Sequence, residues 1–175
     1  MYPKPYIDYL VHFHGDRDYF ECHEVLEEYW KEDDKYNRKN YWVAFIQIAV
    51  SLYHQRRSNF NGSFKMMKNA LAILNNEESA VKKLGLDYNQ LLLTVEKRLK
   101  DIENKQPYTS IFLPITDTDL ISECEKESQL RGIQWGSVSD LADHFLLNKH
   151  SLRNRDEVIE ERLKQKELKI QRRKK

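Results

Sequence analysis

The fold is decided by residues 19–30, which read Tyr19-Phe20-Glu21-Cys22-His23-Glu24-Val25-Leu26-Glu27-Glu28-Tyr29-Trp30. At 3.6 residues per turn, the apolar side chains of this stretch line one broad face and most of its glutamates line the opposite face. His23 and Glu27 are four residues apart, so one lies above the other at the edge of the apolar face. A partly buried carboxylate there needs His23, another donor or a metal ion, because burying a bare charge costs too much.

Composition places the chain among reduced, soluble proteins. Its 175 residues carry a net charge of +1, so no overall field favours nucleic acid or a membrane. Cys22 and Cys124 do not make a disulfide framework, which predicts a cytoplasmic protein. No apolar run is long enough to span a bilayer, and residues 1–5 do not resemble a signal peptide.

The spacing of apolar residues predicts an all-α protein with a compact, bundle-like core and a helical C-terminal extension. Core helices are expected over residues 6–13, 19–30, 41–57, 64–74, 78–84 and 88–103, with a turn at 58–63. The extension is expected to hold helices that start near 118 and span 138–147 and 155–175. We therefore expect a core domain over 1–105, an extended linker over 106–116 and a helical extension over 117–175.

The helix expected over 41–57 is apolar nearly all round, which is typical of a central, buried helix. Its polar stripe consists of Gln47, Ser51 and His54. Polar atoms on a buried helix need partners, and the nearest candidates are His23 and Glu27 on the preceding, antiparallel helix. The sequence therefore predicts a polar cluster between these two helices.

Two blocks, His23–Trp30 and Phe45–His54, resemble the signature of the domain-of-unknown-function 309 family of bacteria, archaea and plastid-bearing lineages. The resemblance covers roughly residues 8–75. Where members usually read Gly-Asn-x-x-Gly-Ala, this chain reads Ser58-Asn59-Phe60-Asn61-Gly62-Ser63. The resemblance implies a compact helical fold with the two blocks at its centre, and it implies no function. It gives no role to any residue, but it marks six of them as motif positions: His23, Glu27, Trp30, Gln47, His54 and Asn59.

One interpretation of the cluster is a metal site. His23 and Glu27 can share one ion, with His54 as the third ligand, and this donor set with one open position is typical of catalytic zinc. The string His23-Glu24-x-x-Glu27 is an HExxE motif, in which Glu24 would occupy the place of the base in a zincin helix. This interpretation implies a metal-dependent hydrolase whose cofactor is a divalent metal such as zinc.

The other interpretation is a structural network that fixes the register of the two central helices. It makes the protein a non-catalytic binding or scaffold protein, which is the function we expect, with Trp30 and Asn59 completing the cluster. Cys22 is then an inert buried thiol, while Arg56 and Arg57 lie in solvent.

Two further predictions concern partners. Residues Arg162–Lys175 hold eight Lys or Arg and one Glu, a composition that favours binding to nucleic acid or to an acidic protein. Aromatic residues within 2–13 would support self-association if they are exposed.

Overall fold

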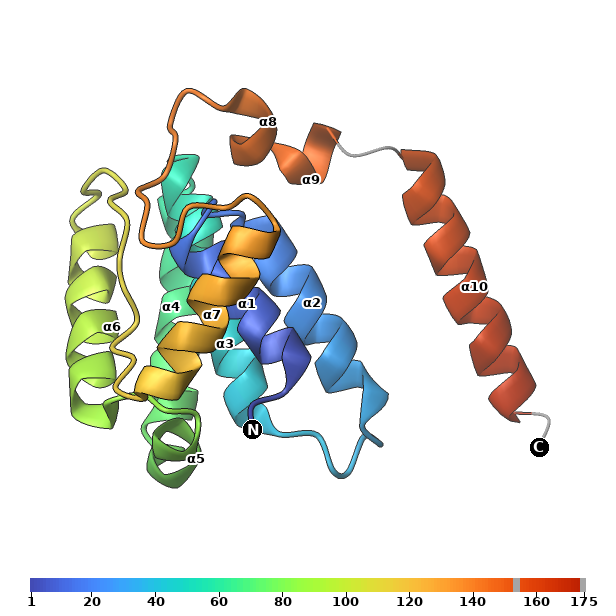
Figure 1. The fold of residues 1–175 in the computed structure, drawn as a ribbon. Helices are drawn as coiled ribbons and strands as arrows, with labels where there is room; N and C mark the ends of the chain where they lie inside the picture. The colour runs from blue at the N-terminus through green and yellow to red at the C-terminus, as the bar shows by residue number, and fades with distance from the viewer. Residues whose placement is uncertain (153–154, 174–175) are drawn as a thin grey trace.

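The computed structural model describes residues 1–152 and 155–173, and the elements it shows there are helices (Figure 1). They are α1 (Lys4–His14), α2 (Tyr19–Glu32), α3 (Asn40–Arg56), α4 (Phe60–Leu74), α5 (Glu78–Lys83), α6 (Tyr88–Glu103), α7 (Thr118–Leu130), α8 (His144–Leu147), α9 (Lys149–Leu152) and α10 (Arg155–Arg173). Within these residues the only β-pairing is a single bridge between Leu86 and Ile115. The all-α prediction is confirmed. None of the described helices has the length and apolar content needed to cross a membrane.

The core is built around α3, which packs against α2 on one side and against α4 on the other. The α3 side chains Phe45, Ile48 and Leu52 are completely buried. Burial of a side chain of this size contributes about 1.5–3 kcal/mol, so this helix supplies much of the driving force for folding. The predicted central position of residues 41–57 is confirmed.

Side-chain caps fix where the main helices begin. Asp18 accepts a hydrogen bond from the backbone N–H of Glu21 at 3.0 Å and starts α2. Asn59 accepts one from the N–H of Gly62 at 3.1 Å and starts α4 at Phe60. The predicted turn at 58–63 is therefore wrong in its second half, because the Asn59 cap draws residues 60–63 into the helix.

The segment that follows α6 returns along the bundle to the turn between α5 and α6 (Figure 1). It is tied down there by two backbone hydrogen bonds, from Thr116 N–H to Gly85 O at 2.8 Å and from Asp87 N–H to Pro114 O at 2.9 Å. Helix α7 then packs on α1 and contributes two fully buried side chains, Leu120 and Cys124. The domain boundaries at residues 105 and 117 stay a prediction, although α7 lies beyond them.

Residues after α7 cross the end of the bundle before the chain leaves it (Figure 1). The predicted helix over 138–147 shortens to α8, because the side chain of Asp140 first holds a turn by accepting from Ala142 N–H. Lys149 in α9 binds Asp18 and Glu21 at 2.6 and 3.2 Å. Helix α10 lies apart from the bundle in Figure 1, and residues 174–175 of the predicted final helix fall outside the described residues.

Candidate functional site

The sequence-predicted pair of α2 does form in the structure. The Nε2 atom of His23 lies 2.6 Å from a carboxylate oxygen of Glu27, and its Nδ1 atom lies 3.2 Å from Glu24. Lys31 binds the second oxygen of Glu27 at 2.5 Å. The ligand atoms of His23, Glu24 and Glu27 lie within 4.8 Å of one another, and no other group of this kind occurs among the side chains that the structure describes.

The two carboxylates hold a proton on the His23 ring. Burial alone lowers the pKa of His23, but the hydrogen bonds with Glu24 and Glu27 raise that pKa to about 9. The hydrogen bond from His23 lowers the pKa of Glu27 to about 2, against the effect of burial and with help from Lys31. At neutral pH the ring is therefore an imidazolium whose two N–H groups both donate to carboxylates. A metal ion would have to displace a proton to bind a ring nitrogen.

His54 does not join this group. Its Nδ1 atom lies 3.2 Å from Nδ2 of Asn59, whose other side-chain atom caps α4. The third potential ligand beside His23 and Glu27 is thus Glu24 and not His54. The reason is local: His54 is in the last turn of α3 and is bound to the α4 cap, whereas Glu24 is next to His23 and reaches its Nδ1.

The other residues of the predicted polar cluster also make no hydrogen bond with His23 or Glu27 among the contacts that the structure describes. Ser51 donates to the carbonyl of Ser63 at 2.7 Å, and Ser63 donates to the carbonyl of Ser51 at 2.7 Å, so Ser51 joins α3 to α4 rather than to α2. Gln47 is half-buried, and its Oε1 atom has no hydrogen-bond partner among the described residues. Trp30 is half-buried too, and Arg38 stacks 4.5 Å above its ring. The network expected between α2 and α3 is therefore reduced to contacts within α2.

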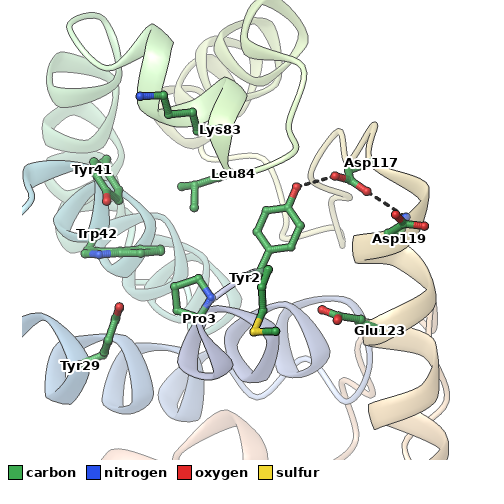
Figure 2. A pocket seen from close by; sticks show the side chains of 11 residues that line it. Tyr2, Pro3, Tyr29, Tyr41, Trp42, Lys83, Leu84, Asp117, Asp119 and Glu123 are labelled. Carbon is green, nitrogen blue, oxygen red and sulfur yellow. Dashed lines mark hydrogen bonds between the residues drawn. The ribbon is translucent and has the colours of Figure 1, made fainter.

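A pocket that the sequence pattern does not indicate lies where the N-terminal residues meet α3, α5 and α7. Its volume is about 500 Å³. Figure 2 shows three aromatic side chains along one side, three carboxylates on the other, and Tyr2 and Pro3 between them. The aromatic side chains are Tyr29, Tyr41 and Trp42, and the carboxylates are Asp117, Asp119 and Glu123. We call this the aromatic–acidic pocket.

The two sides of the aromatic–acidic pocket are held in place by different contacts. The rings of Tyr41 and Tyr29 pack on Trp42, with centroids 4.8 and 5.6 Å away. Tyr2 donates a hydrogen bond to Asp117 at 2.6 Å, and burial together with this bond raises the pKa of Tyr2 to about 12. Asp119 has an exposed carboxylate with no ion pair in the described part of the chain. The pocket thus combines aromatic side chains that pack on one another with an excess of carboxylates.

The structure buries three arginines, Arg17, Arg56 and Arg98. No prediction was made from the sequence for Arg17 and Arg98. Arg56 was expected in solvent, yet only 8% of it is exposed, because its guanidinium group stacks 4.7 Å above the ring of Tyr19. Arg17 is completely buried and Arg98 is 4% exposed. Arg17 in a turn and Arg56 at a helix end carry no local signal of burial, whereas Arg98 lies inside α6 on the apolar face of Leu91, Val95 and Ile102.

Comparisons with known proteins add relatives to this picture. The sequence profile of a family described as a domain of unknown function (DUF309) matches residues 6–66, which hold α1 to α3 and the start of α4. The chain is 52% identical over all 175 residues to the uncharacterized protein YpuF of Bacillus subtilis (strain 168), and the match covers 98% of that protein. No solved structure matches the chain.

Proposed function

Since the chain belongs to the family of the domain of unknown function DUF309, whose description names no activity, we propose from its geometry that it is a cytoplasmic, non-catalytic binding protein. Its binding site is the aromatic–acidic pocket, and its ligand is the cationic side chain of a protein partner, a lysine or an arginine. The observation that carries the proposal is the joint presence of aromatic faces and carboxylates around one opening (Figure 2).

Ring faces and carboxylates both favour a cation. An ammonium or guanidinium group is attracted to the face of a tryptophan or tyrosine within about 6 Å. A pocket of about 500 Å³ is large enough for such a side chain. The exposed Lys83 also lines the pocket, so one cationic side chain faces the three carboxylates and an excess of negative charge remains.

The arrangement around His23 supports a non-catalytic function. A general base must be able to accept a proton, but the His23 ring carries a proton on each nitrogen at neutral pH. Glu24, the weak catalytic candidate of the HExxE motif, is bound to that ring. In this proposal His23 and Glu27 form an ion pair that stabilises α2.

Titration with small cationic probes tests the pocket. We expect Nα-acetyl-arginine amide and Nα-acetyl-lysine amide to shift the indole N–H signal of Trp42 in ¹⁵N spectra, because this buried ring packs on the half-buried rings of Tyr29 and Tyr41, which the cation approaches. Glu123→Gln is expected to weaken binding about threefold, the effect of losing one exposed ion pair. The matched control is Glu96→Gln, which removes an exposed acid of α6 outside the pocket. The proposal fails if uncharged Nα-acetyl-glutamine amide gives the same shift, or if Glu123→Gln binds the probes as the wild type does.

A metal-dependent hydrolase is the second candidate, because His23, Glu24 and Glu27 lie within 4.8 Å of one another. Elemental analysis of protein purified without chelator separates the two functions. We expect less than about a tenth of an equivalent of zinc, since the metal would have to displace a proton from the His23 ring. One equivalent of zinc that disappears in Glu27→Gln, with an unchanged melting temperature, would instead favour the metal site.

The basic segment Arg162–Lys175 stays a separate prediction. Helix α10, which carries most of it, lies apart from the bundle in Figure 1, and the described side chains of 159–167 are exposed. Binding of this segment to nucleic acid or an acidic protein would be independent of the aromatic–acidic pocket.

A further inference from the structure

Two buried arginines meet at the end of the bundle that the segment after α7 covers. Arg17 precedes α2 and is completely buried, while Arg56 ends α3 and is 8% exposed. The two are adjacent, because Nη1 of Arg56 donates to the backbone carbonyl of Arg17 at 2.8 Å. The guanidinium group of Arg56 thus lies against the backbone of Arg17, and both arginines are in a region from which water is largely excluded.

Neither guanidinium group is fully hydrogen-bonded. Arg17 donates through Nε to the carbonyl of Ser137 at 2.9 Å and through Nη1 to that of Ile111 at 2.5 Å. Arg56 donates through Nη1 to the hydroxyl of Ser139 at 2.8 Å as well as to Arg17. The Nη2 atom of Arg17 and the Nε and Nη2 atoms of Arg56 are buried and have no partner among the described residues.

The charge on this pair is not neutralised by the described part of the chain. Among the side chains that the structure describes, no carboxylate forms an ion pair with Arg17 or Arg56. The nearest acids in sequence have other partners, since Asp16 binds His12 and Asp18 binds Lys149. Burying a charge whose donors lack partners is costly, so the unpartnered nitrogen atoms of Arg17 and Arg56 favour an anion from outside the chain.

Arg98 shows what a satisfied buried arginine looks like in the same molecule. It is 4% exposed, and it donates through Nη1 to Gln55 at 3.1 Å and through Nη2 to Thr109 at 3.0 Å. None of its nitrogen atoms is left buried without a partner. The unpaired donors are therefore a property of Arg17 and Arg56 and not of buried arginines in general.

A fourth unpaired polar atom, on a third residue, lies near Arg17. The ring of His14 packs on Phe112 with centroids 5.8 Å apart, and the guanidinium carbon of Arg17 lies 4.7 Å from the centroid of the same ring. The Nε2 atom of His14 is buried and has no partner among the described residues. Trp135 packs on His14 at 4.9 Å, which places an indole next to the site as a fluorescent reporter.

We propose that Arg17 and Arg56 bind an oxyanion, a phosphate ion or the phosphoryl group of a larger ligand, at this end of the bundle. The planar fork of a guanidinium group matches the oxygen atoms of a phosphate, and such charge-assisted hydrogen bonds are the strong ones. The ligand enters past residues 132–143, which cover the two guanidinium groups with turns and extended backbone and contain no helix. This site is separate from the aromatic–acidic pocket, which takes a cation.

The test compares sodium phosphate with sodium chloride at equal ionic strength. Phosphate is expected to change the fluorescence of Trp135, measured in a variant that keeps it as the sole tryptophan, and to raise the melting temperature of the full chain by about 3 °C. Phosphate also stabilises proteins by exclusion from their surfaces, but that effect acts equally on variants.

Two variants separate the site from general effects. Arg56→Met is expected to lose the phosphate response. Its stability in chloride should stay close to that of the wild type, because removing an unpaired buried charge offsets the loss of its hydrogen bonds to Arg17 and Ser139. Arg98→Met is the matched control. It breaks the hydrogen bonds of Arg98 to Gln55 and Thr109, with no unpaired donor removed in exchange, and should be less stable, yet it should keep the full response. Arg17→Met repeats the test if Arg56→Met does not fold.

Two outcomes would contradict the proposed oxyanion site. A wild-type chain with the same melting temperature and fluorescence in phosphate and chloride overturns the proposal, as does a response that survives in both Arg17→Met and Arg56→Met. Phenyl phosphate distinguishes the two sources of the oxyanion. A response equal to that of inorganic phosphate assigns the site to a phosphoryl group on a larger ligand, whereas a response to inorganic phosphate alone assigns it to the free ion.

Discussion

Replacing Gly85 with alanine is expected to lower the free energy of unfolding by about 3 kcal/mol. Gly85 has a φ of +77°, a conformation that side chains rarely adopt. An added Cβ atom would also lie 2.7 Å from the hydroxyl of Tyr2 and 2.9 Å from Cβ of Asp117. The hydroxyl end of Tyr2 can move, but Asp117 Cβ is fixed by the start of α7. The junction of the N-terminus, α5 and α7 must therefore open.

Gly132 and Gly136 provide matched controls for this substitution. Their φ values are +68° and +78°, and an added Cβ atom at either position meets nothing within 4 Å. Alanine there should cost only the conformational penalty of about 1 kcal/mol. Urea denaturation followed by circular dichroism measures all three variants, with the slope m checked for constancy. Equal losses in the free energy of unfolding at all three glycines would show that the added Cβ atom at Gly85 causes no steric strain.

The second large effect concerns the His23–Glu27 ion pair and depends on pH. The pKa of His23 is raised to about 9, so its contribution to stability is complete below about pH 6.5 and is lost as the pH rises through about 9. The pKa of Glu27 is lowered to about 2, so its contribution is complete above about pH 4.5 and is lost as the pH falls through about 2. The pair is therefore most stabilising near pH 5–6.

His23→Gln is expected to cost about 1–2 kcal/mol at pH 6 and much less at pH 10. The magnitude is reduced for solvent screening, because the side chains of His23 and Glu27 are 26% and 31% exposed. Urea denaturation of both proteins at pH 6, 8 and 10 measures the difference. Glu28→Gln, an exposed acid on the same helix, is the control, and its difference from wild type should not change over this range. A His23→Gln cost that stays constant from pH 6 to 10 would contradict the ion pair.

Local patterns were enough to predict the helical architecture. The apolar period of residues 41–57 gave the central helix, since a helix that is apolar all round has to be buried. Spacing also gave the His23–Glu27 contact, because residues at i and i+4 of one helix are neighbours whatever the rest of the chain does. These features depend only on residues close together in the sequence.

Features that depend on distant residues were not predictable in this way. The aromatic–acidic pocket needs Tyr2 beside Asp117, and the arginine pair needs Arg17 beside Ser137, contacts across 115 and 120 residues. The predicted partner of Ser51, on α2, is wrong for a related reason. Helices α2 and α4 both adjoin α3, and periodicity does not say that a small hydroxyl would pair with Ser63 on the far side.

The packing of α7 on α1 has a consequence for synthesis on the ribosome. Helix α1 is translated before α2 and α3, and it can pack with both soon after they emerge. Its contacts with the later helix, such as that of Lys4 with Glu127 at 2.8 Å, join residues more than a hundred positions apart. Until α7 has been translated, an apolar strip of α1 is left without its cover on the nascent chain. Stalled or truncated chains that end before residue 118 should therefore be the forms that engage chaperones or aggregate.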